Sequence, residues 1–161
     1  MANKDIVKGL EPFGKLLNAR MYVTGGIVYP GDVVTMNNAG VVVQASAGTT
    51  ANIGVALSYA ASGGDVLVAD NPEQEFVAQA DDATVAAQTN LGLNYNIIVG
   101  TASTLYKKSA MQLDASTGAT DSNLPLRALR LHPAIDNAFG DKADIVVKLN
   151  NHQRGNATVG L

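Results

Sequence analysis

The sequence predicts a mostly-β fold, and three observations support this prediction. Hydrophobic residues make up 47% of the 161-residue chain, yet they include only three Phe and no Trp, so Ala and Val supply most of the apolar content. Sixteen Gly, with many Asn, Asp, Ser and Thr, provide the turns that short strands need. From Met21 onward, short apolar runs alternate with such turns every 8–12 residues or so, a spacing roughly typical of a meander, a sandwich or a small barrel.

An N-terminal arm, residues 1–19, precedes the first β pattern. Pro12 and Gly14 interrupt any helix there, so we expect an extended segment with at most one short turn. It lacks the continuous apolar stretch of a signal peptide, and none is expected. Terminal segments of this kind are marginally ordered unless they dock on something.

Residues 20–80 are expected to form a small β-barrel. The tetrapeptide Tyr29–Asp32 predicts a turn, because Pro30 fixes its own φ and Gly31 accepts a positive φ. The predicted strands of this part are Arg20–Thr24, Asp32–Met36, Val41–Ala45, Ile53–Tyr59, Asp65–Ala69 and Glu75–Ala80.

Residues 81–161 are expected to form a second, antiparallel, sandwich-like β part that ends in a loose tail. One short helix is predicted near residues 81–90, since Asp81 and Asp82 can cap its free amides and Gly92 ends it. The predicted strands are Leu93–Val99, Lys108–Leu113, Leu126–His132 and Ala143–Asn150, and residues 114–123 are predicted to be a polar loop.

Two finer patterns concern these later strands. Ser109, Met111 and Leu113 alternate with other residues at the period of two that is typical of a half-buried strand. Arg127 and Arg130 are three residues apart, so a regular strand would place them on opposite faces.

Composition excludes several classes of function. The net charge of −3 offers no basic field that would attract nucleic acid. The chain has no cysteine, so a disulfide scaffold, a thiolate zinc site and a cysteine nucleophile are excluded. No stretch approaches the roughly 18–20 consecutive apolar residues of a membrane span, so no membrane partner is expected.

The search for catalytic and cofactor sites leads to none. His132 and His152 are the only histidines, and neither belongs to a metal-binding or hydrolase motif. The acidic pairs and clusters are better explained as helix caps and solvated turns. We therefore expect no enzyme, no metal and no cofactor. A biotinyl or lipoyl carrier barrel is also disfavoured, because no lysine occurs between Lys15 and Lys107 to stand at a hairpin tip.

Two stretches of the chain resemble a known family. The first contains Val28–Val34, Gly40–Val43, Ile53–Ala56 and Gly63–Val66, and the order of these segments looks like the small β-barrel of capsid-stabilising (cement, or decoration) proteins of tailed phages. The second runs from Pro72–Asp81 to Ile145–Gln153 and is similar to virion structural proteins encoded beside the major capsid protein. The resemblance covers roughly residues 20–153 and rests on the spacing of turns and strands.

The resemblance implies a non-enzymatic virion protein that is made in the host cytoplasm and attached to the capsid exterior. It implies a homotrimer that binds the major capsid protein and stabilises contacts between its subunits. Two alternatives stay open, a minor tail or head-fibre component and a carbohydrate-binding β-sandwich module.

The arm is the candidate contact with a partner. It carries apolar side chains although it lies before the first β pattern, and these residues either pack on the barrel or dock on a neighbouring chain. The candidate contact residues are Ile6, Val7, Leu10, Phe13, Leu16 and Leu17.

Overall fold

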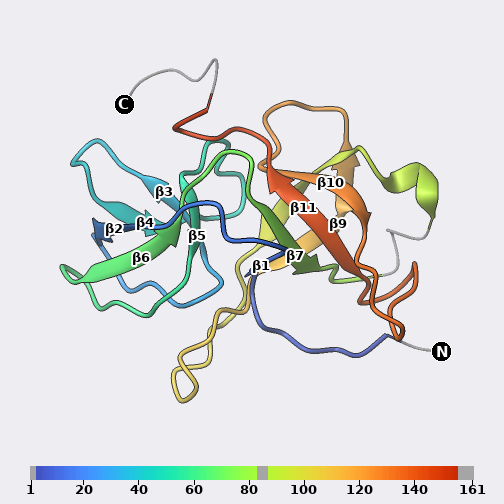
Figure 1. Ribbon diagram of the computed structural model, residues 1–161, viewed down its shortest axis with the longest axis horizontal. Helices are drawn as coiled ribbons and strands as arrows, with labels where there is room; N and C mark the ends of the chain where they lie inside the picture. Colours follow the sequence, from blue (N-terminus) through green and yellow to red (C-terminus); the bar gives the residue numbers. More distant parts are fainter. Residues whose placement is uncertain (1–2, 83–86, 156–161) are drawn as a thin grey trace.

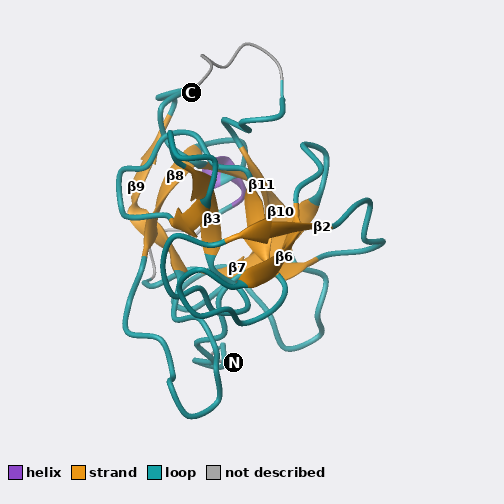
Figure 2. Cartoon of the chain, turned by 90° about the vertical axis from the view of Figure 1, so that its left-hand side faces the viewer, coloured by secondary structure: helices purple, strands orange, loops and turns teal. Residues whose placement is uncertain are grey.

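A computed structural model describes residues 3–82 and 87–155, and within these ranges the chain is almost entirely β (Figure 1). It forms eleven strands in two antiparallel sheets, and a single short 3-10 turn, η1 (Gln88–Asn90), is the one helical element of the described residues (Figure 2). The predicted mostly-β class is confirmed, with two antiparallel sheets and almost no helix among the described residues.

The five-stranded sheet has the order β2-β6-β5-β3-β4. The predicted turn at Tyr29–Asp32 leads into it: the Asp32 N–H donates to the Tyr29 carbonyl at 3.0 Å, and Gly31 has a φ of 95°. The strands are β2 (Arg20–Val23), β3 (Val33–Met36), β4 (Val42–Gln44), β5 (Gly54–Ala56) and β6 (Asp65–Ala69).

The six-stranded sheet has the order β1-β7-β11-β10-β8-β9. Its strands are β1 (Glu11–Pro12), β7 (Glu75–Gln79), β8 (Asn94–Ile98), β9 (Gln112–Ala119), β10 (Leu126–Leu131) and β11 (Asp144–Leu149). β1 and β7 both precede residue 81 in the chain, so this sheet is not built from residues 81–161 alone.

No closed barrel is found among the described residues. In the five-stranded sheet, β2 and β4 are the edge strands, and an isolated parallel bridge between Thr24 and Val42 connects their ends. β7 was expected in the barrel of residues 20–80, but it pairs with β11 and β1 in the other sheet. The barrel over residues 20–80 therefore stays a prediction.

One cluster of buried side chains joins the two sheets. Val33 and Val55 of the five-stranded sheet belong to the same cluster as Phe76 and Tyr95 of the six-stranded sheet. The Val33 N–H also points at the Met111 sulfur, 3.1 Å away. The two sheets thus share a core.

The chain segment after β11 ties the sheets together a second time. His152 forms a parallel bridge with Asn52, and the Gln153 side chain bonds both backbone groups of Met36 at 2.8 and 3.0 Å. The described part of the predicted loose tail, up to residue 155, is therefore docked on the five-stranded sheet; residues 156–161 lie outside the described ranges.

The prediction for strand β9 was wrong in position. Ser109, Met111 and Leu113 are all buried, as their alternation predicts, but the strand begins only at Gln112 and continues to Ala119 through the predicted polar loop. Pairing with β8 supplies the backbone partners, and the Asn96 N–H donates to the Thr117 hydroxyl at 2.8 Å. Polar side chains in this part of β9 form hydrogen bonds with backbone groups of the sheet. An alternation of apolar and polar residues does not reveal a strand of this kind, so the sequence predicted a loop.

The predicted opposite orientation of Arg127 and Arg130 was also wrong. The register of β10 against β11 shifts between Ala128 and Arg130, which marks a bulge. Because of this extra residue, the two arginines pair with Lys148 and Val146, which lie two residues apart on one face of β11, and both arginines are exposed.

The short helix expected near residues 81–90 is described only in part. Residues 83–86 lie outside the described ranges, and the remainder of the segment contains η1. No helix of the described residues is long and apolar enough to cross a membrane.

The far-UV circular dichroism spectrum should be that of a β protein with little helix. The reason is that η1 covers three residues, whereas strands account for most of the regular structure of the described chain. A helix content above about a third, the average for globular proteins, would contradict this architecture.

Candidate interaction surface

The middle of the N-terminal arm is part of the core. Leu10 is 2% exposed and its N–H donates to the Gly31 carbonyl at 2.9 Å. β1 then pairs with β7, and the Phe13 N–H donates to the Glu75 carbonyl at 2.9 Å. Residues 10–13 therefore stabilise the body itself, so removing the whole arm would remove core as well as surface.

Gly9 explains how the arm enters the body. Its φ is 73°, and a Cβ on it would lie 2.6 Å from the Ser109 Cβ and 2.8 Å from the Gly31 Cα. A side chain at this position would be strained in φ and would clash with both neighbours. The close approach of Gly9 thus fixes the arm between the Tyr29–Asp32 turn and the segment before β9.

The first part of the arm, residues 3–8, lies across the surface and carries two exposed apolar side chains. Ile6 is 53% exposed and Val7 is 45% exposed. Polar contacts hold the segment: Lys4 pairs with Asp136 at 3.0 Å, and the buried Gln79 side chain donates to the Lys4 carbonyl at 2.7 Å. Exposed ion pairs contribute about 0–1 kcal/mol each, so the hydrogen bonds of Gln79 and of the Asn3 side chain, which bonds backbone groups of Ala138 and Asp141, hold the segment more than its charges do.

The last part of the arm, residues 14–19, carries the second exposed apolar pair. Leu16 is 43% and Leu17 is 48% exposed, although the Leu17 N–H donates to the Gln74 side chain at 2.8 Å. Phe13, just before it, is half-buried: its ring meets His132 edge-on at 5.4 Å, and the Arg130 guanidinium lies 5.2 Å from the ring centre.

The six arm residues proposed from the sequence therefore fall into two groups. Leu10 and Phe13 pack within the chain, whereas the other four present apolar surface to solvent. The four exposed residues are Ile6, Val7, Leu16 and Leu17. Their contact with a partner remains a prediction.

A polar cavity of about 250 Å³ lies beneath the first part of the arm, with Lys4, Lys8 and Lys142 in its wall. Burial raises the pKa of Asp144, opposed by the charge of Lys8. Asp136 faces the same cavity, and the hydrogen bond from Lys4 lowers its pKa. Of the three lysines, Lys4 pairs with Asp136 inside the cavity wall, whereas Lys8 and Lys142 pair with carboxylates outside it, Glu11 and Asp5.

The cavity provides little for metal chemistry. Within the described ranges, no group of three or more His, Cys, Asp or Glu side chains is placed to hold a metal ion. His132 Nδ1 and Asp144 Oδ1 are buried there without a hydrogen-bond partner among the described groups. Most of the other polar groups in the wall are lysine ammonium groups, which repel a cation, and side-chain amides.

Sequence reasoning missed a second exposed apolar feature, the 103–108 hairpin. It extends below the body in both views (Figures 1 and 2), and its base is closed by reciprocal backbone bonds between Ser103 and Lys108 of 2.9 and 3.2 Å. Leu105 is 79% exposed and Tyr106 is 74% exposed at its tip. A sequence signal was present, since no acidic residue occurs between Asp82 and Asp114 while two lysines do.

Compared with known protein families, the chain matches none, and no curated protein matches it.

Proposed function

We propose that this protein is a non-enzymatic cement protein that binds the exterior of a tailed-phage capsid, as a homotrimer, and stabilises contacts between major capsid protein subunits. It would be made in the host cytoplasm and then reside on the virion. The small-barrel architecture of that family belongs to this proposal too. The observation that carries it is the arm, whose core-anchored centre is flanked by two exposed apolar pairs, Ile6 with Val7 and Leu16 with Leu17.

A cement protein has to remain soluble as a free subunit and later hold neighbouring shell subunits without chemistry. A β body with a shared core supplies the rigid part. The two apolar pairs supply area that gains on burial, at roughly 25 cal/mol for each Å² removed from water. Because Leu10 and β1 fix the arm's centre, both pairs are held near the body, which limits the entropy lost on docking.

Replacing either exposed pair of the arm by serine should weaken binding to cement-free capsids without unfolding the protein. The variants are Ile6→Ser with Val7→Ser, and Leu16→Ser with Leu17→Ser. Full burial of such a side chain stabilises a complex by about 1.5–3 kcal/mol, so we expect a loss of at least about tenfold in affinity for each double variant. The measurement is co-sedimentation with capsids assembled from the major capsid protein of the phage that encodes the chain.

Met21→Thr is the matched control, since Met21 is 59% exposed on β2 and not part of the proposed contact. It should bind like the unaltered protein, and all variants should unfold at similar denaturant concentrations. Failure of the unaltered protein to sediment with capsids would contradict the proposal. So would a protein that binds glycans and does not bind capsids. Size-exclusion chromatography with light scattering measures the molar mass of the free protein and so tests whether it is a trimer. The mass of a monomer would contradict the proposed trimer.

A further inference from the structure

We infer that the 103–108 hairpin is a second attachment point, which inserts Leu105 and Tyr106 into an apolar depression bounded by carboxylates on the capsid surface. This inference rests on the proposed function and adds to it a contact distinct from the arm.

The hairpin does not serve the fold. Ser103 is half-buried and residues 104–108 are all exposed, so the hairpin buries no side chain in either hydrophobic cluster. Ordering residues costs conformational entropy, and here no core burial offsets that cost. Leu105 and Tyr106 are consecutive residues at the tip and both are exposed, and exposed apolar side chains that cluster in this way mark interaction sites.

The hairpin is nevertheless held in one shape. Besides the reciprocal bonds at its base, the Tyr106 N–H donates to the Ser103 hydroxyl at 3.2 Å. Lys107 adopts a φ of 52°, an uncommon conformation for a residue other than Gly. A braced tip loses less entropy when it docks, which favours binding.

The hairpin is also fixed to the body. The Lys107 ammonium lies 4.5 Å from the centre of the Tyr59 ring, and that ring packs on Tyr29 at 5.4 Å. Directly after the hairpin, the Ser109 N–H donates to the Pro30 carbonyl at 3.1 Å. The tip therefore projects at a set angle from the Tyr29–Asp32 turn, which also receives the arm through Gly31.

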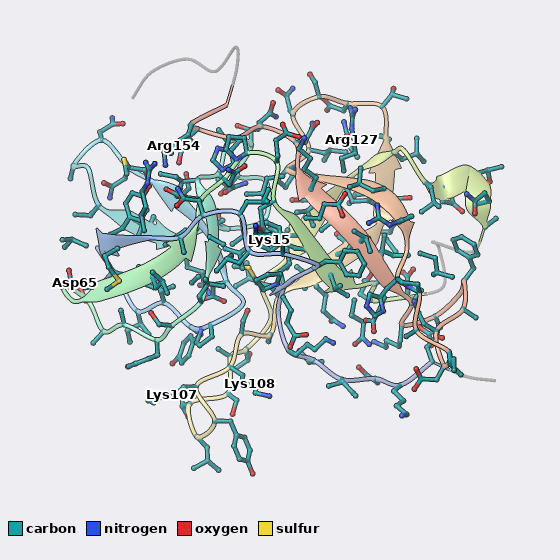
Figure 3. The ribbon with its side chains drawn as sticks, in the orientation of Figure 1. Lys15, Asp65, Lys107, Lys108, Arg127 and Arg154 are labelled. Carbon is teal, nitrogen blue, oxygen red and sulfur yellow. The ribbon has the colours of Figure 1, made fainter. Side chains whose placement is uncertain are left out.

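The charge of the hairpin defines the chemistry of its partner. Lys107 and Lys108 lie on the hairpin, at the lower edge of the molecule (Figure 3), and no acidic residue occurs from 83 to 113. The protein as a whole carries a net charge of −3, so this is a locally basic projection from an acidic protein. Complementarity requires carboxylates around the receiving site. Because the tip is convex, a flat surface would cover little of the Leu105 and Tyr106 side chains. The receiving site on the capsid therefore has to be a depression.

The experiment compares capsid binding by the double variant Leu105→Ser with Tyr106→Ser, by Lys108→Gln, and by the unaltered protein at several salt concentrations. The double variant should bind at least about tenfold more weakly, since buried aromatic anchors dominate interface energetics. Lys108→Gln should bind about two- to tenfold more weakly in low salt, and its affinity should depend less on salt. The Lys107–Tyr59 contact is kept in both variants, and Met21→Thr again serves as the control.

The outcomes separate this inference from the proposed function. Normal binding by both hairpin variants, with weakened binding by the arm variants, overturns the hairpin contact and leaves the cement function standing. No binding by the unaltered protein overturns both. If the unaltered protein binds phosphatidylserine vesicles and the double variant does not, the tip serves a membrane and the inference is wrong. If light scattering shows that the double variant loses an oligomer, the tip binds a second copy and the inference is also wrong.

Discussion

Replacing Asp70 by Ala is expected to lower the free energy of unfolding by about 1–3 kcal/mol, the usual cost of leaving buried hydrogen-bond donors without an acceptor. The cost of breaking a fully buried ion pair does not apply, because the Arg154 side chain is 36% exposed. Asp70 is fully buried at the end of β6, and the Arg154 guanidinium donates to it at 2.6 Å. The Tyr22 hydroxyl and the Asn18 side chain donate to the same carboxylate. Its loss leaves these donors without their acceptor.

The effect should be large because Asp70 joins two stretches that are distant in the sequence, residues 18–22 and the segment after β11. Asn18 belongs to the end of the arm, Tyr22 to β2, and Arg154 (Figure 3) to the segment after β11. Burial, followed by the Asp70 carboxylate, raises the pKa of Tyr22, which shows that the phenol lies within the influence of this charge.

Urea unfolding followed by circular dichroism measures this loss. Asp65→Ala is the control, because Asp65 (Figure 3) is an exposed aspartate that begins the same strand. That change should lie within about 0.5 kcal/mol of the unaltered protein. A double-mutant cycle with Arg154→Ala should give a coupling energy above about 1 kcal/mol. Equal stability of the two aspartate variants would show that the Asp70 cluster contributes little.

The strands were predictable where the local pattern is strong. Asp65–Ala69 was predicted with its exact bounds, and the turn at Pro30 and Gly31 formed as their backbone preferences require. β1 was not predictable, because a two-residue strand containing Pro12 has no period of its own and exists only through pairing with β7. The bulge in β10 escaped prediction for a related reason, since register is set by the partner strand.

The candidate surface divides in the same way. Apolar residues in the arm were recognisable, but the sequence alone left open which of them the body covers. Leu10 is covered because Gly9 lets the backbone approach Gly31, a contact between residues far apart in the chain. The exposed tip at Leu105 and Tyr106 was missed because the predicted strand began at Lys108, and the sequence alone does not show that the two residues before it are left uncovered.

Acidification should destabilise the protein through His152. This side chain is 5% exposed, and burial, as the main cause, lowers its pKa from 6.5 to about 4. In the folded state Nδ1 accepts the Arg154 N–H at 3.0 Å, while Nε2 is buried without a hydrogen-bond partner among the described groups. Because Nδ1 is the acceptor, the neutral ring carries its proton on Nε2, and charging the ring requires a second proton on Nδ1. That proton would break the bond from the Arg154 N–H and place a charge in this buried site, so the neutral ring is favoured.

The sign follows from proton binding. Between the unfolded pKa of about 6.5 and the folded pKa of about 4, the unfolded chain binds the proton and the folded protein does not. The contribution of His152 is therefore fully present above about pH 6.5 and is lost as the pH falls toward 4, by up to about 3 kcal/mol. Burial raises the pKa of Asp32 and of Asp144, and these two groups act in the opposite direction in acid.

The comparison with His152→Gln isolates the histidine from those carboxyl groups, because Gln keeps a polar acceptor and does not titrate. Urea unfolding of both proteins from about pH 7 to about pH 4 should show that the unaltered protein loses about 2–3 kcal/mol more than the variant. Met21→Thr is again the control, since Met21 is exposed on β2 and the change alters no titratable group. It should keep the pH dependence of the unaltered protein. The prediction is wrong if the free energy of unfolding changes with pH in the same way for the unaltered protein and for His152→Gln. His152 would then be protonated without cost in the folded state, and its burial would not make the docking of the segment after β11 sensitive to acid.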